Sequence, residues 1–201
     1  MKIDKRSFEK QYCGCWNEKE EVLEPETLQA CRDELNKFGV NDIMIDAGAN
    51  TGLMSLYLKK GKSIAVESSD TIFKVLCSNI NLNGLNIKPL NLALYNEVRG
   101  YSVAYSEWGG TSTIMLDDLK ENKTLTGDQL VETYVEPQEK VRLIKIDCEE
   151  NSRRVLESFT ETIINHKPVV IVELKDGIKE DWFKEMGYEN FKYMEGNLVV
   201  K

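Results

Sequence analysis

The sequence lacks a hydrophobic run of the roughly 18–20 residues that a membrane-spanning helix requires. The basic residues within 1–6 are not followed by an apolar stretch, so this end does not resemble a secretory signal. We therefore expect a cytoplasmic location and no membrane span.

Histidine occurs once, at position 166, and the five cysteines are scattered along the chain. An odd number of scattered cysteines without a secretion signal argues against a disulfide framework. Cys13, Cys15 and Cys31 could begin a zinc site, but a closed site needs four ligands at recognisable spacing, and His166 is far away in the sequence. Reduced thiols and no bound metal are the expectation.

An excess of basic residues is also missing, because the net charge is −8. Nucleic-acid binding depends on basic groups that neutralise phosphates. The charge balance therefore argues against general nucleic-acid binding. The oligomeric state is left open.

Short apolar segments alternate with amphipathic ones, as in a parallel sheet with helices on both faces. The expected domain covers residues 25–201, preceded by an N-terminal extension over residues 1–24. The pattern predicts strands over 42–46, 63–67, 87–94, 141–147 and 169–174, and helices over 25–38, 52–60, 70–83 and 152–164.

The tail from Trp182 predicts a short helix and a hairpin that turns near Gly196, which adds an antiparallel edge to the sheet. The expected fold is α/β and Rossmann-like, with seven mostly parallel strands. Residues 95–140 form an insertion on the expected acceptor side. They predict strands at 101–105 and 130–135 and a short helix near 116–121.

Ligands of open parallel sheets bind beyond the carboxyl ends of the strands. All but one of the expected strand ends carry an acid, namely Asp46, Glu67, Asp147 and Glu173; the remaining one carries Ala93 and Leu94. Such regular placement of acids indicates a binding site rather than ordinary loop polarity.

The segment Asp46 to Gly52, DAGANTG, links the first strand to the next segment. Gly48 permits a tight turn, and Gly52 would let a following helix pack near the strand, with free N–H groups at its start. Asn50 and Thr51 complete the turn. A dinucleotide site usually carries G-x-G-x-x-G, but these glycines are spaced G-x-x-x-G. Asp46 would repel a pyrophosphate and attract the ammonium group of S-adenosylmethionine.

Glu67 ends the second predicted strand. A carboxylate there can accept hydrogen bonds from a ribose diol. The pairing of this acid with the glycine turn favours a nucleoside-containing cofactor.

These residues together resemble the FkbM family of S-adenosylmethionine-dependent methyltransferases over roughly residues 40–200. The resemblance rests on segments in matching order: DAGANTG (46–52), AVE (65–67), NINLNG (79–84), NLAL (91–94), GGTS (109–112), KIDCE (145–149) and IVEL (171–174). The family pattern continues K-I-D-x-E with Gly-x-Glu, whereas this chain has Glu150-Asn151-Ser152.

The resemblance implies methyl transfer to a hydroxyl oxygen of a sugar or another small molecule, with Ala93 and Leu94 beside the adenine. The reaction needs positioning and benefits from a general base. Asp147 is the first candidate for that base and Glu149 the second. Lys145 either pairs with these acids or assists at the acceptor oxygen.

Two other functions stay open. A nicotinamide-dependent oxidoreductase with a degenerate fingerprint would use the same turn. A non-catalytic cofactor-binding protein on the same scaffold would account for the departure at Glu150 and Asn151.

Overall fold

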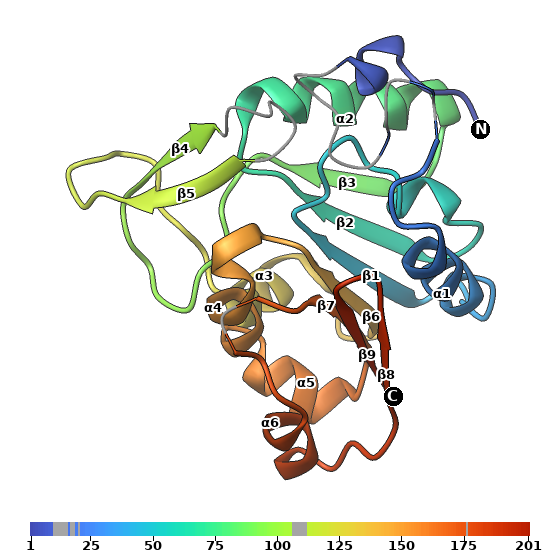
Figure 1. Cartoon of the computed structure of the whole chain (residues 1–201), viewed down its shortest axis with the longest axis vertical. Helices are drawn as coiled ribbons and strands as arrows, with labels where there is room; N and C mark the ends of the chain where they lie inside the picture. Colours follow the sequence, from blue (N-terminus) through green and yellow to red (C-terminus); the bar gives the residue numbers. More distant parts are fainter. Residues whose placement is uncertain (10–15, 17–18, 20, 106–111, 176) are drawn as a thin grey trace.

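A seven-stranded sheet forms the centre of the computed structural model, which describes residues 1–9, 16, 19, 21–105, 112–175 and 177–201. The strand order is β3-β2-β1-β6-β7-β9-β8 (Figure 1). The first five are mutually parallel, and β9 runs antiparallel to both β7 and β8. The bounds are β1 Asp42–Ala47, β2 Lys62–Val66, β3 Ile87–Leu90, β6 Lys140–Ile146, β7 Val169–Glu173, β8 Phe191–Met194 and β9 Asn197–Val200.

Helices cover both faces of this sheet, as the uniformly apolar strands predict. Side chains alternate along β1, so Met44 faces one layer and Ile45 the other. The Met44 layer contains α1 (Pro25–Leu35) and α2 (Asp70–Asn83). The Ile45 layer contains α3 (Gly127–Tyr134), α4 (Ser152–Glu157), α5 (Thr160–His166) and α6 (Glu180–Glu185).

The hairpin of β4 (Tyr101–Tyr105) and β5 (Ser112–Leu116) forms a separate two-stranded antiparallel sheet. It extends away from the main sheet (Figure 1). Ser112 and Ile114 on β5 nevertheless reach the pocket described below.

The helix predicted over 52–60 is wrong, because the segment forms only a 3₁₀ turn, η3 (Ser55–Tyr57). Gly52 has φ +94°, which an α-helix cannot contain. Leu53, Leu56 and Leu58 are all buried, so the apolar run reflects burial rather than helical periodicity.

The strand predicted over 130–135 is also wrong, because these residues belong to α3 and its end. Thr126 and Gln129 form a reciprocal capping box that starts this helix. The helix expected near 116–121 is absent: β5 ends at Leu116, and Asp117 N donates to Gly100 O. The helix expected over 152–164 is divided into α4 and α5 at Ser158 and Phe159.

The N-terminal segment packs on the α2 side of the sheet. Its 3₁₀ turn η1 (Lys5–Phe8) buries Ser7, and Trp16 joins the core on that side. Asn79 of α2 donates to Ser7 Oγ and accepts from Asp4 N. Within the described ranges, no helix has the length and apolar character of a bilayer span.

Candidate functional site

A pocket opens where the carboxyl ends of β1, β2, β3 and β6 meet, beside β5. Its volume is about 690 Å³ when the space open to solvent at its mouth is included. It is lined by Gly48, Asn50, Val66, Glu67, Ser68, Leu92, Ala93, Leu94, Ser112, Ile114, Asp147, Cys148, Glu149 and Asn151.

The pocket brings together most of the site residues predicted from the sequence: Gly48, Asn50, Glu67, Ala93, Leu94, Asp147 and Glu149. The other predicted residues lie behind its wall, and they are Asp46, Thr51, Gly52 and Lys145. These four can act on a ligand in this pocket only through neighbouring groups or through their charge.

The backbone N–H groups of the turn after β1 already have acceptors within the protein. Gly48 N and Ala49 N both donate to Val66 O, at 3.0 and 2.9 Å. Asn50 N donates to Glu67 Oε2, and Thr51 N to Asn50 Oδ1. Gly52 N donates to Ala49 O. The turn therefore has no N–H group free to bind a phosphate.

This geometry corrects the expectation of a free helix N-terminus at the turn. No helix follows Gly52; instead, a Cβ at that position would lie 2.7 Å from Leu76 Cδ1 of α2. A Cβ at Gly48 would lie 1.8 Å from Asp147 O. Gly48 is thus required by close packing against backbone and joins the ends of β1 and β6, whereas Gly52 is favoured chiefly by its φ of +94°.

Glu67 is the most firmly positioned acid of the pocket. Its Oε1 accepts from Ser69 N at 2.8 Å and its Oε2 from Asn50 N at 3.0 Å. A carboxylate offers about four acceptor positions, so it can still bind hydroxyl groups of a ligand. Burial raises the pKa of Glu67 to about 7, against the lowering effect of these two N–H groups.

Asp46 lies behind the pocket and is almost fully buried. Its Oδ2 accepts from Ser55 Oγ at 2.7 Å, and Ser55 Oγ lies 2.8 Å from Ser63 Oγ. Among the described residues, Oδ1 has no hydrogen-bond partner. Burial raises the pKa of Asp46, although the charge of Lys145 opposes that effect.

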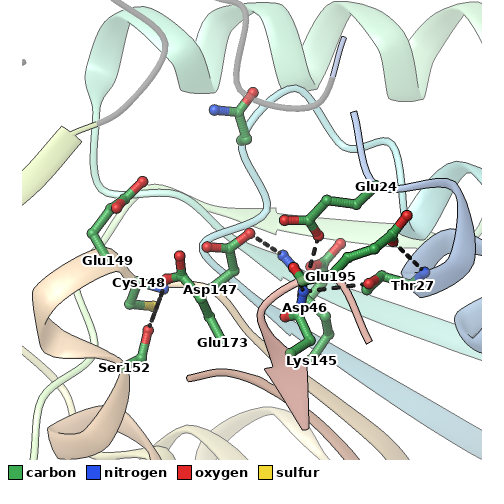
Figure 2. Close-up of polar contacts among 12 residues, drawn as sticks. Glu24, Thr27, Asp46, Lys145, Asp147, Cys148, Glu149, Ser152, Glu173 and Glu195 are labelled. Atoms are coloured by element: carbon green, nitrogen blue, oxygen red, sulfur yellow. Dashed lines mark hydrogen bonds and ion pairs between the residues drawn. The ribbon is translucent and has the colours of Figure 1, made fainter. Parts of the chain in front are cut away.

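Lys145 and Asp147 form an ion pair at the end of β6 (Figure 2). Lys145 Nζ lies 2.7 Å from Asp147 Oδ2, and the lysine side chain is only 4% exposed. Asp147 is 29% exposed and lines the pocket, so it is the member of the pair that a ligand can reach.

Glu149 follows with φ +53°, a conformation that is uncommon for a residue other than glycine. Its carboxylate pairs with Lys175, whose Nζ also lies 3.0 Å from Glu173 Oε1.

The thiol of Cys148, which also lines the pocket, stays protonated at neutral pH, because burial and the charge of Asp147 raise its pKa.

His166 lies at the amino edge of the sheet, away from the pocket. It is half-buried rather than fully exposed, and its Nδ1 accepts from Val141 N at 3.1 Å. Burial and the charge of Lys140 lower its pKa, so it is a neutral acceptor at the start of β6.

Sequence reasoning missed several residues of the pocket wall: Ser68, Leu92, Ser112, Ile114, Cys148 and Asn151. Ser112 and Ile114 come from the β4–β5 hairpin, and no sequence pattern places that hairpin against the sheet. Asn151 Nδ2 donates to Thr113 Oγ1 at 2.9 Å and joins the hairpin to the 3₁₀ turn η4 (Glu149–Asn151) that follows β6. Cys13, Cys15 and the segment Gly109–Thr111 lie outside the described residues.

In the part of the chain that the structure describes, no group of three or more His, Cys, Asp or Glu side chains is arranged to hold a metal ion. The pocket lining itself offers carboxylates, serine hydroxyls, asparagine amides, the Cys148 thiol and an apolar wall.

No protein-family model matches the sequence, and no curated protein matches it. Solved structures do resemble the fold. One is a methyltransferase FkbM from Methylobacillus flagellatus KT, with a TM-score of 0.54 and 13% identity, over 82% of this chain and 44% of that one. This chain thus spans less than half the length of that protein.

Two further structures resemble the chain. A precorrin 8w decarboxylase from Methanobacterium thermoautotrophicum has a TM-score of 0.52 and 12% identity, over 100% of this chain and 97% of that one. The methyltransferase domain of METTL16 has a TM-score of 0.50 and 10% identity, over 86% of this chain and 64% of that one. The chain therefore has the Rossmann-like methyltransferase fold, as predicted, and identities this low show the fold alone.

Proposed function

We propose that this chain is an S-adenosylmethionine-dependent methyltransferase that methylates a hydroxyl group of a sugar or another small molecule. The observation that carries the proposal is the placement of Glu67 in the pocket. It is held by two backbone N–H groups, beside a glycine turn and an apolar wall.

The residues present fit the parts of this cofactor. Glu67 would accept hydrogen bonds from the ribose hydroxyls, each worth about 1.5–3 kcal/mol when charge-assisted. Ala93, Leu94 and Ile114 offer an apolar surface for the adenine. Gly48 and Asp147 would hold the methionine end, with Asp46 adding negative charge from behind. The bound cofactor would supply an electrophilic methyl group on a positively charged sulfur.

The turn argues against a dinucleotide in the same pocket. A pyrophosphate needs free N–H groups, and the N–H groups of residues 48–52 already have acceptors. The surrounding acids, Asp46, Glu67 and Asp147, would also repel its two negative charges. This observation favours the sulfonium cofactor over NAD.

The acceptor would lie between Asp147, Glu149 and the β4–β5 hairpin, because these form the pocket wall nearest β6 and β5. Two carboxylates in that wall suit a neutral hydroxyl and disfavour a phosphorylated acceptor. Asp147 is placed to take the proton of such a hydroxyl, a role typically worth about 10²–10⁴-fold in rate.

The test is incubation of the chain with methyl-labelled S-adenosylmethionine and separate pools of glycans, small metabolites, proteins and RNA. We expect label in a neutral hydroxyl compound. Asp147→Asn should reduce that transfer more than it reduces cofactor affinity, because the carboxamide cannot accept the proton. Tight cofactor binding without transfer to any pool would instead support a non-catalytic protein.

A further inference from the structure

Asp147 and Glu173 stand side by side at the carboxyl ends of two neighbouring parallel strands. The register pairs Ile146 of β6 with Val172 of β7. Asp147 follows Ile146 and Glu173 follows Val172, so these two acids are neighbours. Residues in step on parallel strands point to the same face. Figure 2 shows both carboxyl groups in one small region, close to Cys148.

The charges of this region do not balance. Lys145 Nζ lies 2.7 Å from Asp147 Oδ2, and Lys175 Nζ lies 3.0 Å from Glu173 Oε1. Lys175 also pairs with Glu149. Three carboxyl groups therefore share two ammonium groups, and the excess of negative charge raises the affinity of this region for one proton.

The other charged groups that act on the pair, within the described residues, do not restore the balance. They are acids from each neighbouring element: Glu24 before α1, Asp46 on β1 and Glu67 after β2. The Cys148 thiol beside Asp147 is protonated and neutral. Ser152 Oγ approaches Glu173 Oε2 at 3.5 Å and accepts from Cys148 N at 3.0 Å, which ties Glu173 to the pocket wall.

The two carboxyl groups differ in proton affinity. Burial raises the pKa of Asp147, but the charge and hydrogen bond of Lys145 and a hydrogen bond with Glu173 outweigh burial and lower it. Burial and the charge of Asp147 raise the pKa of Glu173 to about 7, against the opposing effect of Lys175. At neutral pH the pair is therefore partly ionised, and any proton that it holds lies mainly on Glu173.

We propose that Glu173 is a positioning residue of the pocket: when both carboxyl groups are ionised, Asp147 and Glu173 accept the acceptor's proton as a unit and share it. This inference rests on the proposed function. Glu173 does not line the pocket and acts through Asp147.

The acceptor oxygen bonds to the methyl carbon, the carbon–sulfur bond breaks with its electron pair left on sulfur, and the hydroxyl proton passes to Asp147. The pair, doubly ionised before the reaction, then holds that proton between Asp147 and Glu173. A proton acceptor whose pKa lies near the working pH is the most effective kind of general base.

Carboxyl carbon NMR on the full chain, labelled with ¹³C at aspartate and glutamate, tests this coupling without any acceptor. We expect the resonances of both residues to respond to one titration step near pH 7. Glu173→Gln should remove that step from the Asp147 resonance, and Asp147→Asn should lower the titration midpoint of Glu173. Glu189→Gln, at an exposed position, is the matched control and should change neither.

Independent titration of Glu173, or an Asp147 resonance that keeps its step near pH 7 in Glu173→Gln, would overturn the shared proton. Binding of S-adenosylhomocysteine to the same samples, measured by calorimetry, separates the two proposals. If S-adenosylhomocysteine binds and the carboxyl groups of Asp147 and Glu173 titrate independently, only the proposed role of Glu173 is wrong. Absent binding to the unaltered chain removes the proposed function, whatever the titration shows.

Discussion

Gly48 lies so close to the backbone of Asp147 that a β-carbon at position 48 would be 1.8 Å from the Asp147 carbonyl oxygen. Its φ of +77° is also in the region that other residues rarely adopt. This contact sets the distance between the turn after β1 and the end of β6, and both line the pocket. The glycine is therefore a packing requirement of the site.

Gly48→Ala should open this contact and abolish cofactor binding. Forced overlap in a packed region costs about 1–3 kcal/mol beyond the backbone strain. The control is Gly84→Ala, because Gly84 has φ +60° but no atom within 4 Å of an added β-carbon. That variant should lose only the roughly 1–2 kcal/mol of left-handed strain and keep binding. Urea denaturation measures the unfolding free energy of both variants, and equal losses in Gly48→Ala and Gly84→Ala would contradict the account.

Cofactor affinity should rise with pH through the titration of Glu67. In the proposed complex the ionised carboxylate would accept hydrogen bonds from both ribose hydroxyls, and its pKa without ligand is about 7. Binding that requires the ionised form should therefore be about tenfold tighter at pH 8 than at pH 6. Calorimetry of S-adenosylhomocysteine checks this, and Glu67→Gln should bind weakly with little dependence on pH. The same pH dependence in that variant would assign it to another group.

Glu67 should also make the stability of the ligand-free protein depend on pH. Its folded pKa of about 7 exceeds its ordinary value of 4.5, so the folded state holds more protons between these values. Its contribution to stability is complete below pH 4.5 and is lost as pH rises through 7. Glu67→Gln should remove up to about 1.4 kcal/mol per pH unit of this decline. Urea denaturation of both proteins from pH 5 to pH 8 measures the difference, and parallel curves would count against it.

Asn79 should couple the N-terminal segment to the turn after β1. Its Nδ2 donates to Ser7 Oγ at 3.0 Å and to Thr51 O at 2.7 Å. Asn79→Ala leaves buried groups unpaired, at about 1–3 kcal/mol, and should speed hydrogen exchange in both segments. Asn83→Ala is the comparison, because Asn83 bonds to Lys2 but not to the turn. It should speed exchange only at the N-terminus; faster exchange at Thr51 and Gly52 as well would refute the coupling.

The strands and their acids could be predicted from the sequence because burial on both faces produces short apolar runs that end abruptly. β1, for example, spans Asp42–Ala47, one residue beyond the predicted end. An apolar run also led to the wrong prediction of a helix over 52–60, where the leucines are buried around an irregular turn. Burial, rather than a period of 3.6, made that segment apolar.

The strand predicted at 130–135 failed although the sequence carried the correct signal. Thr126 and Gln129 have the spacing of a capping box, and that local signal outweighs the β-propensity of Val131 and Val135. The sequence placed residues 95–140 on the acceptor side, but which residues of the β4–β5 hairpin form the pocket wall could not be predicted, for a different reason. Its position depends on long-range contacts such as that between Asn151 and Thr113, which no local pattern encodes.

Among the site residues, those that follow strands directly were the easiest to predict, because parallel strands bring their carboxyl ends to one edge. Glu67 and Asp147 are of this kind, and both line the pocket. Asp46, by contrast, lies inside β1, one residue before its end, and its carboxylate accepts from Ser55 behind the pocket. The sequence shows where a strand ends, whereas the direction of the side chain depends on strand register and on neighbours.

The most direct measurement is calorimetric titration of the unaltered chain with S-adenosylhomocysteine and, separately, with NAD. The account predicts binding of the first and not of the second. Glu67→Ala should weaken binding at least tenfold, or about 1.4 kcal/mol, and the exposed control Glu189→Ala should leave it unchanged. Binding of NAD without binding of S-adenosylhomocysteine would contradict the account at its centre.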